Sequence, residues 1–197
     1  MGKINVDKQD LTIYILKNIE RAPKQIVKLT SEKFGVSRQT VYRYIKELIE
    51  QELLTAIGEG PNKSYKIKRT NEKLEFNLNI NKPDEEETWR YHIKPLLPVL
   101  RENVNDICHY GVGEMINNVT EHSGASKLII IIEYNILEIR FWIIDNGIGI
   151  FNKLQNDFNL EDKNQAIIEL AKGKLTSDPA RHSGEGIFFT SRMFDDF

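Results

Sequence analysis

Three short stretches constrain most strongly what this chain can fold into. They are Glu114-Met115-Ile116-Asn117-Asn118, Asp145-Asn146-Gly147-Ile148-Gly149 and Gly184-Glu185-Gly186. The first lies where apolar residues recur at helical spacing, so that its acidic residue and its last amide, four apart, share one face. The second follows an apolar segment of strand character, and the third precedes another helical segment. Each stretch alone is weak evidence. Their order, together with their positions on a helix, after a strand and before a helix, is what makes them informative.

Charge divides the chain into two parts. Residues 1–70 carry 14 Lys and Arg against 8 Asp and Glu, whereas residues 71–197 carry 13 against 21. A basic part joined to an acidic part indicates two domains with different partners, and the basic part is the candidate for binding nucleic acid. We therefore predict a first domain over 1–70, a linker or strand over 71–84, and a second domain over 85–197.

Composition excludes several other classes of protein. An apolar fraction of 40% supports a buried core, and the single cysteine, Cys108, excludes both an internal disulfide framework and a multi-cysteine zinc site. The longest aliphatic run, Leu128 to Ile132, is too short to span a bilayer. The first ten residues are mostly polar, a pattern not typical of a signal peptide. We expect a cytoplasmic protein without membrane contact.

The basic part has the pattern of three helices followed by a hairpin. We expect helices at 10–20, 26–34 and 37–52, and strands at 53–57 and 64–68. Gly35 suits a helix C-terminus and Ser37 suits the N-cap of the third helix. The stretch KFGVSRQTVYRYIKELIEQELL resembles the turn and recognition helix of bacterial winged helix-turn-helix regulators.

The third helix and the hairpin carry the candidate DNA-binding side chains. They are Arg38, Gln39, Tyr42, Arg43 and Lys46 on the helix face away from the core, with Lys63 and Lys66 on the wing. Arginine and glutamine pair with guanine and adenine edges, and a helix N-terminus favours a phosphate. We therefore predict double-stranded DNA as a partner. The alternative is a module for protein contacts or dimerisation, which leaves a regulatory protein partner and a homodimer open.

The second domain alternates helical and strand patterns. Alternation over Leu74–Ile80 predicts a half-buried strand. The other expected elements are helices from Asp84 and over 100–122, strands at 127–134 and 137–144, a loop over 150–183 and a helix over 187–193. The second strand of the hairpin leads directly into Asp145.

This succession resembles the GHKL ATPase superfamily, which includes DNA gyrase, Hsp90, sensor histidine kinases and MutL-type proteins. The stretch GEMINNVTEHSGA is closest to the histidine-kinase and anti-sigma-factor-kinase branch. The resemblance implies an α/β sandwich with helices on one face of a mixed sheet, within a chain of the α+β class. The family sheet continues beyond the last helix, so we expect a C-terminally truncated fragment whose GHKL domain lacks its final strands.

The resemblance also implies ATP and Mg²⁺ as cofactors. Asp145 would accept a hydrogen bond from the adenine amino group, and Asn118 would bind Mg²⁺ through its amide oxygen. Glu114 would be the catalytic residue that orients or deprotonates the attacking water. The further nucleotide-binding residues would be His122, Gly147, Gly149, Gly184 and Gly186. The loop over 150–183 would be a lid, with Lys153, Lys163, Lys172, Lys174 and Arg181 as candidate phosphate contacts.

Together these features predict a DNA-binding transcriptional regulator controlled by an ATP-binding or ATPase domain. Two alternatives stay open. One is a serine/threonine protein kinase like those that act on anti-sigma factors, with the winged helix used for docking. The other is a nucleotide-binding protein without turnover, because the residues leave open whether ATP is hydrolysed or only bound.

Overall fold

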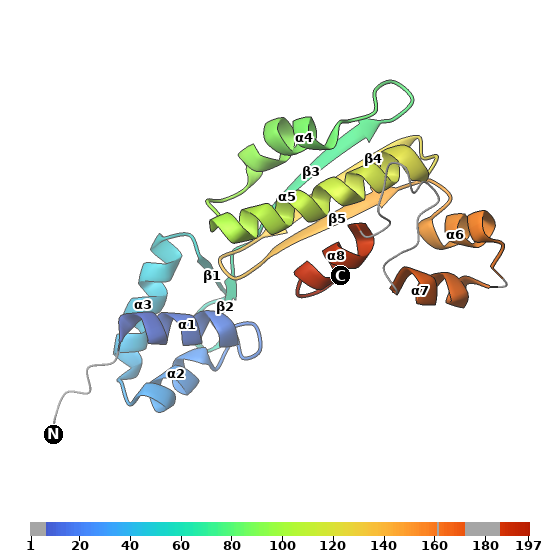
Figure 1. The fold of residues 1–197 in the computed structure, drawn as a ribbon. Helices are drawn as coiled ribbons and strands as arrows, with labels where there is room; N and C mark the ends of the chain where they lie inside the picture. Colours follow the sequence, from blue (N-terminus) through green and yellow to red (C-terminus); the bar gives the residue numbers. More distant parts are fainter. Residues whose placement is uncertain (1–6, 161, 172–185) are drawn as a thin grey trace. The chain divides into compact units, whose positions relative to one another are not determined.

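The computed structural model describes residues 7–160, 162–171 and 186–197, and the fold over these residues is α+β (Figure 1). The chain forms two compact units. The first comprises residues 1–71 and 133–140, and the second comprises residues 72–132 and 141–197. Within the described ranges, every helix is too short or too polar to cross a lipid bilayer.

The first unit holds three helices and a two-stranded antiparallel sheet. The elements are α1 (Lys8–Asn18), α2 (Ile26–Phe34), α3 (Arg38–Glu50), β1 (Leu54–Ile57) and β2 (Ser64–Ile67). The two strands pair with Leu54 opposite Ile67, and the turn between them contains a short 3-10 helix, η1 (Gly60–Asn62). Helices and strands therefore follow the order expected from the sequence.

Local chemistry sets the boundary between α2 and α3. Gly35 ends α2 with φ 65°, a left-handed conformation that glycine adopts without the Cβ penalty. The Ser37 side chain then accepts a hydrogen bond from the Thr40 N–H at 3.1 Å, which caps α3. Both predicted ends are confirmed.

The core of the first unit draws on all three helices and both strands. Its buried side chains are Leu11, Ile15, Leu16, Ile19, Ile26, Val27, Val41, Ile45, Leu48, Leu54, Tyr65 and Ile67. Thr30 of α2 is fully buried beside them, and its hydroxyl has no hydrogen-bond partner among the described residues. One closed cluster therefore holds the three helices against the hairpin.

A three-stranded sheet in the order β3–β4–β5 underlies the rest of the chain. Its strands are β3 (Thr70–Asn77), β4 (Lys127–Tyr134) and β5 (Ile139–Asp145). Glu75 of β3 pairs with Lys127 at the start of β4, and Arg69 before β3 pairs with Glu133 near the end of β4. The strands are therefore antiparallel, and the expectation of a mixed sheet is wrong over the described residues. A short turn joins β4 to β5, and such a turn requires antiparallel neighbours.

β3 begins four residues before the start that the alternating pattern predicted. The predicted strand covered 74–80, but β3 covers Thr70–Asn77. The Asn77 side chain accepts a hydrogen bond from the Asn79 N–H at 3.1 Å, and this local turn ends the strand. Half of the segment 71–84, which was expected to be a linker or strand, is therefore part of the sheet.

The remaining helical segments belong to the second unit. They are α4 (Glu85–Thr88), the π-helical η2 (Trp89–Ile93), η3 (Lys94–Leu96), α5 (Glu102–Asn117), the π-helical η4 (Asn118–His122), α6 (Ile150–Phe158), α7 (Lys163–Ala171) and α8 (Gly186–Met193). The segment 150–183 was expected to be a loop, yet its described part contains α6 and α7. Leu154 of α6 and Ala166 of α7 are buried, so apolar contacts hold this helical pair.

α5 runs along the three-stranded sheet and contacts both α4 and α8 (Figure 1). Leu128, Ile130 and Ile132 of β4 are fully buried, as is Ile116 of α5. Trp142 is 40% exposed and Ile144 of the same strand is 45% exposed. The sheet thus has one covered side, and α5 provides the main part of that cover.

Candidate functional site

The end of α5 carries the first predicted motif. The Asn118 N–H donates to the Glu114 carbonyl, so the two residues are one helical turn apart, as the sequence predicted. At Asn118 the helix widens into the π-helical η4, a deviation that is frequent at functional sites. The Asn118 side chain is half-buried and makes no hydrogen bond within the described residues, and the His122 ring nitrogen lies 3.9 Å from the Glu121 carboxylate.

The second motif forms a tight loop after β5. The Asp145 Oδ1 accepts a hydrogen bond from the Gly147 N–H at 2.7 Å, and the Ile148 N–H donates to the Ser123 carbonyl at 3.0 Å. A Cβ at Gly147 would overlap that same Ser123 carbonyl, so only glycine fits there. Gly149 follows with φ 79° and precedes α6. The loop is therefore held against the residue that follows η4.

Two residues that the sequence reasoning missed hold this loop in place. The Asn146 side chain accepts from the Ser126 N–H at 3.0 Å and from the Lys127 N–H at 2.9 Å. The buried Ser123 hydroxyl donates to the Val119 carbonyl at 2.7 Å. Asparagine and serine side chains commonly bond to nearby backbone, which marks them as candidates, but their partners here are known only from the fold.

The third motif meets the first. α8 begins at Gly186, and a Cβ at Gly186 would overlap the Glu114 carboxylate. Further along the same two helices, a Cβ at Gly111 would lie 2.5 Å from the Phe194 ring. α5 and α8 therefore approach closely, and the predicted catalytic carboxylate lies at the first turn of α8. Gly184 is outside the described residues.

The remaining predicted nucleotide contacts are only partly described. The Lys153 ammonium pairs with Asp157 at 2.8 Å within α6, and Lys163 begins α7. Lys172, Lys174 and Arg181 fall outside the described residues. Burial raises the pKa of the Cys108 thiol to about 11, so this residue of α5 is a core side chain rather than a nucleophile at neutral pH.

A Mg²⁺ ion at Asn118 would need phosphate or water oxygens to complete its ligands. Among the described residues, no three His, Cys, Asp or Glu side chains gather closely enough to hold a metal ion. The Asn118 amide oxygen is nevertheless a hard ligand, and Mg²⁺ in proteins commonly takes few protein ligands and several phosphate or water oxygens. The donor chemistry therefore fits a metal delivered with a nucleotide.

The predicted DNA-binding residues all lie at the surface of the first unit. They are Arg38, Gln39, Tyr42, Arg43 and Lys46 of α3, with Lys63 and Lys66 of the β1–β2 hairpin. Lys46 pairs with Glu50 at 3.5 Å, and the Arg43 guanidinium lies 5.4 Å from the Tyr44 ring centroid. Burial, and secondarily the nearby Tyr42, raises the pKa of Tyr65 on β2.

The second unit thus holds Gly186 against Glu114, and it holds the loop after Asp145 against Ser123. Carboxylates, an amide and glycine backbone are groups that can bind a base or a metal-bound phosphate. Comparison of the chain with models of protein families, with curated proteins and with solved structures found no match. The function is therefore inferred from the residues themselves.

Proposed function

We propose that this protein is a DNA-binding transcriptional regulator whose second unit, of GHKL type, binds Mg-ATP and controls a winged helix-turn-helix in the first. The observation that carries the proposal is that the helical segment with the first motif contacts residues of both other motifs. Ser123, at the end of the helical segment with Glu114 and Asn118, holds the loop after Asp145. The same segment meets α8 at Gly186.

Asp145 suits adenine recognition because its carboxylate is already oriented. The Gly147 N–H holds Oδ1 at 2.7 Å, which leaves Oδ2 to accept a hydrogen bond from an exocyclic amine. Gly147 has no Cβ, and the space that a Cβ would fill is taken by the Ser123 carbonyl, so the loop packs tightly against that residue. The loop therefore offers one directed acceptor that this packing holds in place.

Asn118, Glu114 and α8 suit the phosphate end of the nucleotide. The Asn118 amide oxygen would hold Mg²⁺, which neutralises phosphate charge when it is bound. The N–H groups at the start of α8 favour an anion, and Glu114 at that position would orient a water molecule. In this proposal Glu114 serves turnover rather than affinity.

The surface of α3 and the hairpin suits a DNA backbone and major groove. Its exposed cations would neutralise phosphates, whereas Gln39 and Arg38 at the first turn of α3 are suited to base edges. An affinity that falls steeply with salt is the expected signature of such a surface.

Calorimetry with Mg-ATP tests the nucleotide site. Asp145→Ala should weaken binding by more than about tenfold, because it removes a hydrogen bond to a charged acceptor. Asp106→Ala, which changes an exposed carboxylate of α5, is the matched control and should bind as the unchanged protein does. Equal affinity of Asp145→Ala and the control would refute the assignment.

Phosphate release distinguishes the modes of action that remain open. If ATP is hydrolysed, Glu114→Gln should abolish release while binding stays within about threefold, because a base for water acts in the transition state. Binding without any release in the unchanged protein would identify a nucleotide-binding protein without turnover. Transfer of labelled phosphate to a protein substrate would instead favour the kinase alternative.

A further inference from the structure

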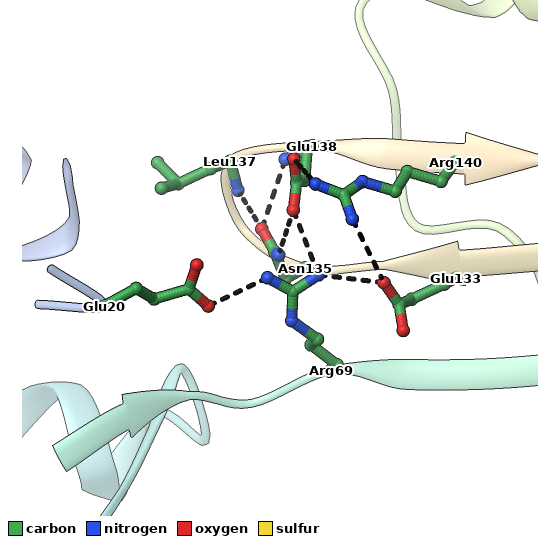
Figure 2. Close-up of polar contacts among 7 residues, drawn as sticks. All are labelled: Glu20, Arg69, Glu133, Asn135, Leu137, Glu138 and Arg140. Atoms are coloured by element: carbon green, nitrogen blue, oxygen red, sulfur yellow. Dashed lines mark hydrogen bonds and ion pairs between the residues drawn. The ribbon is translucent and has the colours of Figure 1, made fainter. Parts of the chain in front are cut away.

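Arg69 is the centre of an ion-pair cluster within the first unit (Figure 2). Its guanidinium reaches Glu20 at 2.8 Å, Glu133 at 2.8 Å and Glu138 at 3.0 Å. Arg140 completes the group by pairing with Glu138 at 2.9 Å. One side chain between β2 and β3 therefore joins the segment after α1 to both sides of the β4–β5 turn.

The turn itself is rigidly organised around Asn135. Its side-chain oxygen accepts from the Leu137 N–H at 2.7 Å and from the Glu138 N–H at 3.1 Å, and its backbone N–H donates to the Glu138 carbonyl at 2.9 Å (Figure 2). Such an Asx turn fixes where the Glu138 carboxylate points. Residues 133–140 are called the tip from here on. Arg69 thus forms ion pairs with a tip whose turn is already ordered by its own hydrogen bonds.

The centre of the cluster is partly protected from solvent, whereas the side chains of Glu20 and Arg140 at its edge are about half exposed. The Arg69 side chain is 26% exposed and that of Glu133 is 20% exposed. The hydrogen bond that Arg69 donates to Glu20 is the largest influence raising the pKa of Arg69, which stays charged throughout. Without Arg69, three carboxylates would face one arginine, so its removal should release the tip rather than merely weaken one contact.

We propose that the Arg69 cluster transmits the nucleotide state of the second unit to the DNA-binding surface of the first. This inference rests on the proposed function and names how its two sites are coupled. β5 starts directly after Glu138 and ends at Asp145, and its seven residues span about 20 Å as one hydrogen-bonded strand. A shift of the Asp145 loop on nucleotide binding would therefore reach the tip through β5, and Arg69 passes it to Glu20 after α1.

The test compares DNA affinity with and without Mg-ATP in the full chain. The unchanged protein should show a ratio of at least about fivefold, within the usual range of allosteric coupling. Arg69→Ala and Glu138→Gln should bring that ratio to within about twofold of one. Lys68→Ala is the matched control, because this neighbouring cation pairs with Glu52 inside the same unit and away from the tip, and it should keep the full ratio.

Calorimetry on the same variants separates this inference from the proposed function. Both cluster variants should bind Mg-ATP as the unchanged protein does, because neither residue touches the Asp145 loop. Failure of the unchanged protein to bind Mg-ATP would overturn the proposed function and this coupling with it. A ratio retained in both cluster variants, or lost equally in Lys68→Ala, would overturn the coupling alone. Glu138→Gln keeps the shape of the turn and decides the outcome if Arg69→Ala does not fold.

Discussion

The two units differ in how far apart in sequence their decisive contacts lie. The core of the first unit lies entirely between residues 11 and 67, around helices whose ends are set by neighbouring residues such as Ser37. The candidate site of the second unit instead depends on contacts between segments near residues 114, 123, 147 and 186. The first unit therefore depends on one closed core for its stability, whereas the second depends on a few long-range contacts for its chemistry.

The largest expected effect comes from a cavity-forming substitution in the core of the first unit. Ile45→Ala, at a residue 1% exposed in α3, should cost about 2–5 kcal/mol through lost burial and a cavity. DNA binding should be lost with that unit. Urea denaturation followed by circular dichroism gives the cost, with Ile13→Ala at a 40% exposed position as the control. If Ile45→Ala also abolished Mg-ATP binding, the two units would not be independent, which would contradict the difference drawn between them.

A smaller effect is expected from adding a methyl group to the nucleotide loop. Gly147→Ala should destabilise the second unit by about 1–3 kcal/mol, because the new Cβ would overlap the Ser123 carbonyl. Calorimetry should show weakened Mg-ATP binding, whereas the DNA affinity measured without nucleotide should be unchanged. Gly113→Ala is the matched control, since its Cβ would meet only the Glu85 side chain at 3.7 Å. Equal nucleotide affinity in the two variants would contradict the account of the loop.

The first core also contains a position that can be improved. Thr30→Val should stabilise the protein by about 1 kcal/mol, because it replaces a buried hydroxyl that lacks a partner with a methyl group of similar size. Thr40→Val is the contrasting variant, since its hydroxyl lies 2.9 Å from the Ser37 hydroxyl at the start of α3. The melting temperature should rise for Thr30→Val and should not rise for Thr40→Val. A lower melting temperature for Thr30→Val would show that the hydroxyl is satisfied in solution.

The smallest expected effect is a pH dependence at the Arg69 cluster. Burial raises the pKa of Glu138, but Arg140 and Arg69 outweigh burial and hold it below its ordinary value of 4.5. A depressed pKa stabilises the fold above the ordinary value, and this stabilisation is lost as the pH falls through the folded-state pKa. The stability difference between the unchanged protein and Glu138→Gln should therefore shrink below pH 4.5.

Denaturation at several pH values measures that difference. Glu59→Gln, at an exposed position in the β1–β2 turn, provides the control and should show no such change. A difference between the unchanged protein and Glu138→Gln that was the same at acid and neutral pH would mean that the cluster does not hold the tip.

Sequence reasoning succeeded where the determining interaction is local. The left-handed Gly35 and the capping Ser37 act within a few residues, so the bounds of α2 could be predicted closely. The limits of β4 also match the prediction, because its apolar run is uninterrupted. The early end of β3 depends on the Asn77 side chain competing for its own backbone, which alternation alone does not reveal.

The candidate site was predictable in its residue types but not in its contacts. Glu114, Asn118 and Asp145 follow from motif order, yet nothing in the sequence indicates that Ser123 would accept from Ile148. The contact between Ser123 and Ile148 is decided by the fold as a whole and not by local propensity. The helices α6 and α7 within 150–183 contact each other, so their packing is local to that segment.

The most direct test of the central claim is the DNA affinity of the unchanged protein and of Asp145→Ala, each with and without Mg-ATP, by fluorescence anisotropy. Mg-ATP should change the affinity of the unchanged protein by at least about fivefold and should leave that of Asp145→Ala unchanged. Identical DNA affinity of the unchanged protein with and without Mg-ATP, at concentrations where calorimetry shows the nucleotide bound, would contradict the claim that nucleotide controls DNA binding.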